Sequence, residues 1–183
     1  MKLRALLLTT ALFAAPVAMV QAQTATTPAA NSAPAATAPM QVTDPAQFAA
    51  MAASSNQFEI ASSTLAVERA TNPDVVAFAE QMIADHTKAA QDMMPAAQEE
   101  GVTPPTDMED RHQQMVDQLN GLEGEEFDAA YIAAQVQAHD EAVALFESYS
   151  TGGPEGALKA FATATLPVLQ QHQEHVHGLS GNH

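Results

Sequence analysis

From Asp44 onward, long segments with helical periodicity are separated by short turns that contain proline or glycine. Asp44-Pro45 and Asn72-Pro73 each place an N-cap side chain before a proline at the first helical position, a combination that starts a helix. No segment alternates apolar and polar residues with the two-residue period of a strand. The sequence therefore predicts an all-α chain with helices over residues 45–70, 73–100, 106–122, 125–150 and 154–178.

Short turns force neighbouring helices into antiparallel pairs. The first two helices make one hairpin and the last two make another, and the short helix 106–122 connects them. Two hairpins that face each other bury their apolar stripes in a four-helix bundle. Pro95 and Pro167 lie inside helices, so each predicts a kink or an early helix end.

The N-terminal residues have a different composition. Lys2 and Arg4 precede an apolar run and then small residues, the pattern of a secretory signal peptide cleaved after Ala22. Residues 23–43 are rich in Ala, Pro and Thr and read as a flexible tether. The predicted division is a signal peptide over 1–22, a disordered tether over 23–43, a helical bundle over 44–179 and a tail over 180–183. This pattern predicts a periplasmic or secreted protein.

Charge and cysteine content exclude several classes of function. The chain has no cysteine, which removes disulfides, thiolate zinc sites and iron–sulfur clusters. The formal charge is -16, and loss of Lys2 and Arg4 would make it -18. Such a surface disfavours binding to nucleic acid and to anionic membranes, and it attracts cations. An alternative explanation is that the acidic residues only keep the protein soluble. No stretch after the signal peptide is long and apolar enough to span a bilayer.

Three of the long helices carry a histidine on the apolar stripe. His86 follows Met82 by one turn, His139 falls between Val136 and Val143, and His172 continues the stripe of the last helix. Glu59 lies beside the inner face of the first helix. A bundle core has no water to solvate such groups, so each needs a partner. Imidazole with carboxylate suits Zn, Fe or Mn, and the sequence predicts metal ligands at Glu59, His86, His139 and His172.

Axial position indicates which of these side chains share a layer. At ~1.5 Å per residue, Glu59 and His86 lie ~20 Å from the turn at Pro73, and His139 lies ~22 Å from the turn at Pro154. His172 lies ~27 Å from Pro154, about one helical turn beyond the others. The count predicts a shared layer for the first three residues, which His172 joins only through helix tilt or a kink.

Further residues are secondary candidates. The thioethers of Met82 and Met93 near His86 favour Cu(I), yet methionines at helical spacing also fill cores. Asp128 and Tyr131 begin the fourth helix and suit a second coordination shell or the closure of the bundle end. His175 shares a helix face with His172, a chelating spacing in what is otherwise a polar tail.

Three polar residues are expected to take no part in the site. Asp85 and Asp140 point outward by helical phase, and His112 of the connecting helix is predicted to be exposed.

Three segments resemble a group of exported bacterial proteins. They are FEIASSTLAVERATNPDVVAFAEQMIADHTKA, FDAAYIAAQVQAHDEAVALFE and LKAFATATLPVLQQHQEHV, which together cover most of residues 58–176. They resemble family 4142 of the domains of unknown function, in the ferritin-like superfamily. The resemblance implies a ferritin-like four-helix bundle and an exported location, and it implies no activity. The helix around His86 also resembles another exported ferritin-like family that has a Met-Ile-x-His-His motif. In the present sequence Asp85 stands in place of the first histidine of that motif.

Three hypotheses follow from these patterns. The first is a bundle that binds one transition metal ion, Zn, Fe, Mn or Cu, in its core. The second is a non-catalytic structural or stress-related envelope module whose core histidines are satisfied by hydrogen bonds. The third, a redox enzyme of di-iron type, is disfavoured because Ile83 and Val136 stand where the Glu-x-x-His motif of di-iron bundles needs glutamate.

Overall fold

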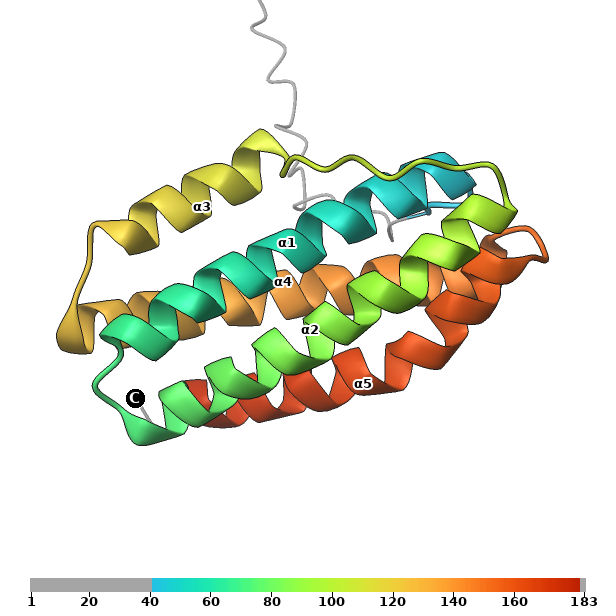
Figure 1. Cartoon of the computed structure of the whole chain (residues 1–183). Helices are drawn as coiled ribbons and strands as arrows, with labels where there is room; N and C mark the ends of the chain where they lie inside the picture. Colours follow the sequence, from blue (N-terminus) through green and yellow to red (C-terminus); the bar gives the residue numbers. More distant parts are fainter. Residues whose placement is uncertain (1–40, 182–183) are drawn as a thin grey trace, which may run out of the picture. The chain divides into compact units, whose positions relative to one another are not determined.

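The computed structural model describes residues 41–181, which form five helices and no strand within that range (Figure 1). Each predicted helix is present, and the all-α prediction is confirmed. The third helix begins later than Thr106, because the backbone amide of Glu109 is bound by Ser54 before the helix starts. The helices are α1 (Pro45–Arg69), α2 (Pro73–Glu99), α3 (Asp110–Asn120), α4 (Gly124–Gly152) and α5 (Ala157–Ser180).

The predicted signal peptide and most of the predicted tether lie outside the described residues. The last residues of the tether range, 41–43, are described, and Val42 is buried against α4. Its backbone amide donates to Ser148 Oγ at 2.8 Å.

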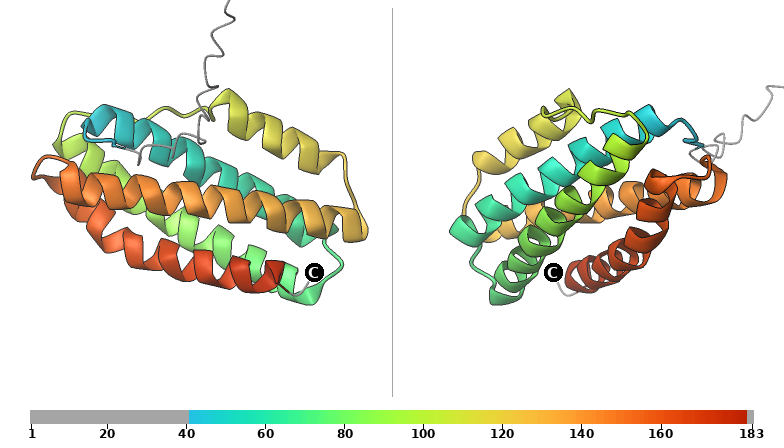
Figure 2. Two further views of the ribbon diagram at one scale, coloured as in Figure 1. Left: turned by 180° about the vertical axis from the view of Figure 1, so that it is seen from behind. Right: turned by 45° about the vertical axis from the view of Figure 1, so that its right-hand side comes forward.

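Four long helices form the bundle, with α1 against α2 and α4, and α5 against α2 and α4 (Figures 1 and 2). Phe48 near the start of α1 stacks on Tyr149 near the end of α4, and Ser63 near the end of α1 bonds Tyr131 near the start of α4. These two helices are therefore antiparallel. The connection between α2 and α4 runs back along the bundle and carries α3 beside α1, a long crossover of the ferritin-like kind (Figure 1).

Polar side chains cap the helix ends, some at the start of the helix that follows them and some from a neighbouring helix. Asp44 and Asn72 accept backbone N–H bonds at the starts of α1 and α2, as their sequence context predicts. Glu100, at the end of α2, accepts from the amide of Leu158 at the start of α5. Asp128 accepts from the amide and hydroxyl of Thr71, so it closes the α1–α2 turn. Neither internal proline ends its helix, because α2 continues to Glu99 and α5 to Ser180.

A layer of polar side chains divides the apolar core into two clusters. One cluster includes Phe48, Met93 and Phe146. The other includes Phe78 and Met82. Between them lie buried groups that an apolar core would exclude, namely Glu59, Ser62, His86, Gln135, His139 and His172.

The prediction of an exposed His112 is wrong. The side chain is 2% exposed, it stacks on Phe58 with ring centroids 5.4 Å apart, and its Nδ1 lies 2.6 Å from Ser54 Oγ. Ser54 Oγ also accepts from the amide of Glu109, so this one hydroxyl bonds both His112 and the start of α3. The apolar stripe in the sequence of α3 is too short to predict that His112 packs on α1. This contact attaches the α2–α4 connection to α1.

Replacement of Ser54 by alanine is expected to destabilise the fold by about 1–3 kcal/mol, because His112 Nδ1 and the Glu109 amide would both lose a buried partner. Chemical denaturation would measure the change. Thr64→Ala removes an exposed hydroxyl that bonds only within its own helix, and it should stay within about 0.5 kcal/mol of the wild type. Equal stabilities for the two variants would contradict the anchoring role of Ser54.

Candidate metal centre

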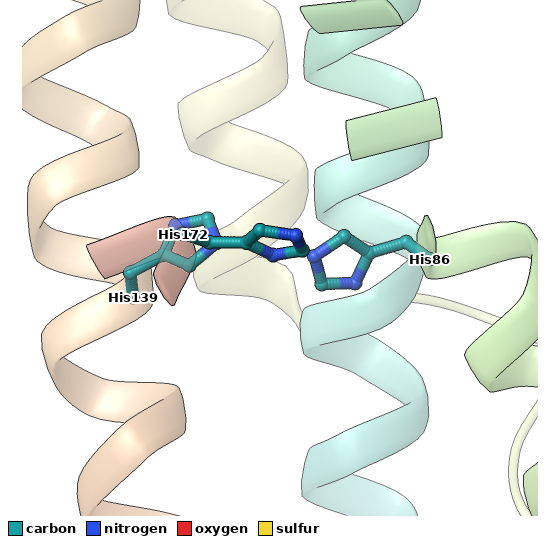
Figure 3. Close-up of side chains that lie close together, drawn as sticks. All are labelled: His86, His139 and His172. Carbon is teal, nitrogen blue, oxygen red and sulfur yellow. The ribbon is translucent and has the colours of Figure 1, made fainter. Parts of the chain in front are cut away.

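Three histidines from three helices point their rings at one another inside the bundle (Figure 3). His86 comes from α2, His139 from α4 and His172 from α5. Their exposed fractions are 5%, 0% and 2%. One nitrogen of each ring lies within 4.8 Å of the corresponding nitrogen of the other two. The group could hold a single metal ion if the rings move slightly closer on binding, because two nitrogens bonded to one zinc ion at about 2.0–2.1 Å are at most about 4.2 Å apart.

His172 lies in the same layer as the other two histidines and not one turn beyond them. The sequence count started at Pro154, but α5 begins only at Ala157. The intervening turn residues add no rise along the helix axis. Counted from Ala157, His172 lies ~22 Å along α5, close to the ~20 Å between His139 and the end of α4 at Gly152.

The outward nitrogen of each ring has an oxygen partner. His139 Nδ1 donates to the backbone carbonyl of Gln135 at 3.0 Å. His172 Nε2 donates to Asp85 Oδ2 at 2.9 Å, and His86 Nδ1 donates to Asn56 Oδ1 at 3.0 Å. Carbonyl and carboxylate oxygens only accept hydrogen bonds, so each of these nitrogens carries a proton, and in a neutral ring the other nitrogen then has none. The remaining nitrogen of each ring therefore presents a lone pair.

Those inward lone pairs have no donor among the described residues. His86 Nε2, His139 Nε2 and His172 Nδ1 are all buried without a hydrogen-bond partner there. Burial lowers the pKa of His86 well below its usual value, and the nearby His139 and His172 lower it further. Burial also lowers the pKa of His172, although Asp85 opposes the shift. Neutral rings with converging lone pairs are the form in which imidazole binds a metal.

Glu59 is the acidic group of this layer. Its Oε1 lies 3.8 Å from His139 Nδ1, the side chain is 1% exposed, and neither oxygen accepts a hydrogen bond of normal geometry among the described residues, although the Gln135 side chain lies near enough to affect its pKa. Burial raises the pKa of Glu59, while His139 and the Gln135 side chain oppose that rise. Burial thus disfavours the charged carboxylate, and a cation beside it would lower the pKa of Glu59 again.

Two outer partners of the histidines escaped the sequence analysis. Asp85 is not simply outward, because its carboxylate reaches across to His172 on the neighbouring helix. Helical phase could not show this, since the contact depends on the α2–α5 packing. Asn56 lies one turn before Glu59 on the same face of α1, and that spacing is a signal that could have found it.

The secondary candidates do not belong to the group of three histidines, although Met93 lines a small cavity beside His86. Met82 belongs to one apolar cluster and Met93 to the other, on either side of the histidine layer. Tyr131 bonds Ser63 at 2.8 Å, and burial raises its pKa. Asp128 bonds the α1–α2 turn instead of a histidine. His175 is exposed, with its ring against the edge of Phe78.

The donor set fits a mononuclear site. Three imidazoles with an open position and a carboxylate nearby correspond to the ligand count of catalytic zinc sites, and the same donors also bind Cu, Fe and Mn. A di-iron centre needs carboxylates from several helices. Glu59 lies near His139 Nδ1, the nitrogen that bonds the Gln135 carbonyl, and Asp85 bonds the outer nitrogen of His172, so the group of inward ligand atoms consists of the three histidines.

The remaining findings concern relatives and the membrane. None of the helices in the described region is both long and apolar enough to cross a bilayer. Neither the comparison with curated proteins nor that with solved structures gives a match. The model of the domain-of-unknown-function family DUF4142 matches residues 26–179. The chain therefore belongs to the DUF4142 family.

Proposed function

We propose that this protein binds one transition metal ion per chain through His86, His139 and His172. The observation that carries the proposal is the set of three inward lone pairs, which are buried together with no donor among residues 41–181. A water molecule has only two protons to donate, so it cannot satisfy three acceptors at once. One cation accepts electron density from all of them.

The outer contacts support the same assignment. Metal-bound histidines typically donate their second ring N–H to a carboxylate or carbonyl oxygen, which fixes the ring and makes it a better ligand. Asp85, Asn56 and the Gln135 carbonyl supply such partners here. Glu59 would offset part of the charge of a bound ion. The absence of thiolate from the chain leaves nitrogen and oxygen donors, for which Cu(II) and Zn(II) bind more tightly than Fe(II) or Mn(II).

We further propose that the protein is exported and buffers or senses its metal outside the cytoplasm. The signal-like sequence of residues 1–22 supports export. The second hypothesis from the sequence, a structural or interaction module with satisfied core histidines, is less favoured. Each histidine does have one satisfied nitrogen, but the other nitrogen lacks a partner within the described region.

The first test is metal titration of the purified, untagged protein by calorimetry, with elemental analysis of the loaded form. One ion of Zn(II) or Cu(II) per chain is expected. His86→Leu should weaken binding by more than the about 10–100-fold typical of an outer-shell change. The metal-free variant should be as stable as the wild type or more stable, because an imidazole nitrogen without a partner is removed.

The matched control is His177→Leu, because His177 is an exposed histidine that bonds Asp140 on the surface. Its affinity should equal that of the wild type. Retained affinity in His86→Leu, or an equal loss in both variants, would rule out the core site.

A second test concerns Glu59. Glu59→Gln keeps the shape of the side chain but cannot ionise, so metal affinity should fall about 10–100-fold. The number of protons released on binding should also fall, because a cation lowers the raised pKa of the wild-type carboxyl, whereas the amide has no such proton to release. Calorimetry in two buffers with different ionisation enthalpies measures that number. Unchanged affinity and unchanged proton release would show that Glu59 plays no part.

A third prediction concerns the pH dependence of the metal-free protein. The pKa values of His86, His112 and His172 are lowered from 6.5 in the fold, so the unfolded chain binds more protons below that pH. Stability should therefore fall as pH drops through about 6.5, by at most about 1.4 kcal/mol per pH unit for each histidine. The raised pKa of Glu59 acts in the opposite direction, since it favours the fold at lower pH.

Denaturation in the presence of a chelator, at about pH 7 and about pH 5.5, would measure the balance. His86→Leu removes one of the three contributions and should flatten the dependence. Stability that rises on acidification would contradict this account of the histidines.

A further inference from the structure

A groove of about 600 Å³ runs along the surface between α2 and α5. Its α2 wall carries three acidic residues, Asp85, Asp92 and Glu99, and one basic residue, Lys88. Its α5 wall is mostly apolar and includes Phe161. A concave surface with an excess of carboxylates raises the local concentration of cations.

A smaller cavity of about 20 Å³ lies next to His86 inside the bundle. This volume is enough for one water-sized particle. All four long helices contribute to its walls, with Asn56 from α1, Met93 from α2, Phe146 from α4 and Leu169 from α5. It therefore lies within the bundle, on the side of the histidine layer that faces the cluster of Phe48 and Met93.

The groove and the cavity share part of their walls. Ala89, Phe161 and Thr165 line both. These three side chains are therefore the partition between solvent in the groove and the cavity beside His86. Two of the three are small, so motion of the Phe161 ring would open a passage without movement of a helix.

Asp85 provides a second, independent link between the groove and the histidines. Its carboxylate lines the groove, where the side chain is 38% exposed, and it accepts a hydrogen bond from His172 Nε2. His172 itself is 2% exposed, and its other nitrogen is among the three without a partner. The groove thus carries a negative charge in direct contact with the buried cluster.

We propose that the α2–α5 groove is the entrance through which a divalent transition-metal cation reaches the three histidines. The ion is attracted by the acidic wall, passes Asp85, and crosses the partition of Ala89, Phe161 and Thr165 into the cavity beside His86. This inference rests on the proposed function, because it describes how the same site is filled. It adds a side of the bundle and, in Ala89, Phe161 and Thr165, residues that control the rate of binding but not its strength.

The lack of cysteine in the chain allows a direct test. Ala89 is partly exposed, so Ala89→Cys can be modified in the folded protein with methanethiosulfonate reagents of increasing size, which a reducing agent removes again. Ala144→Cys is the matched control, because Ala144 is also partly exposed but lines a surface recess on α4 away from α2 and α5. Both variants are compared only in their modified forms, so that a free thiol does not bind metal.

Stopped-flow mixing with Zn²⁺ would give the association rate, and competition with a chromophoric chelator would give the equilibrium affinity. Modification at position 89 should slow association by about 10-fold or more, and increasingly with reagent size, while affinity changes by less than about threefold. Modification at position 144 should change neither quantity.

The outcomes separate the two proposals. If modified Ala89→Cys binds Zn²⁺ as fast as the wild type, the entrance lies elsewhere and the three-histidine site still stands. An equal slowing in both cysteine variants also overturns the entrance, because the effect would not depend on the groove. If the wild type binds no Zn²⁺, Cu²⁺, Fe²⁺ or Mn²⁺ at all, the proposed function fails and the entrance fails with it.

Discussion

The burial of three imidazole nitrogens close together is the constraint that the rest of the structure must satisfy. Each nitrogen is buried, and none has a donor within the described residues. A buried polar group without a partner costs about 1–3 kcal/mol, and a domain is stable by only about 5–15 kcal/mol. Three such nitrogens together with both oxygens of Glu59 would lower the free energy of unfolding by a large part of that value. A single bound cation would turn these unfavourable groups into ligands.

The scaffold holds this layer from both sides. An apolar cluster with Phe48 and Phe146 lies on one side, and a cluster with Phe78 and Phe127 lies on the other. Hydrogen bonds from the rings to Asn56, Asp85 and the Gln135 carbonyl orient the histidines from outside. Glu59 and the three histidines come one from each long helix. Helix packing therefore determines the spacing of the nitrogens, and a small change in the register of one helix would separate them.

Most of the fold could be predicted because it depends on local signals. Capping residues followed by prolines marked the starts of α1 and α2. The apolar stripes identified the inward helix faces, which carry His86, His139 and His172. The level of His172 could not be predicted, because a sequence count cannot show where a turn ends and helical rise begins. The same limit applies to Asp85 and His112, whose partners lie on other helices. Local phase describes one helix at a time, whereas these contacts depend on how two helices pack.

The balance of charge explains why the site differs from a di-iron centre on a similar bundle. Two iron ions bring at least four positive charges and need several carboxylates to neutralise them in a medium of low dielectric constant. Here the buried layer contains one glutamate and three rings whose neutral form is favoured by burial at His86 and His172. One divalent ion with ionised Glu59 would leave a net charge of about +1, which Asp85 can compensate through His172. The small number of carboxylates thus favours one ion in this layer over two. The carboxylate of Asp85, which compensates part of the charge, also lines the surface groove between α2 and α5.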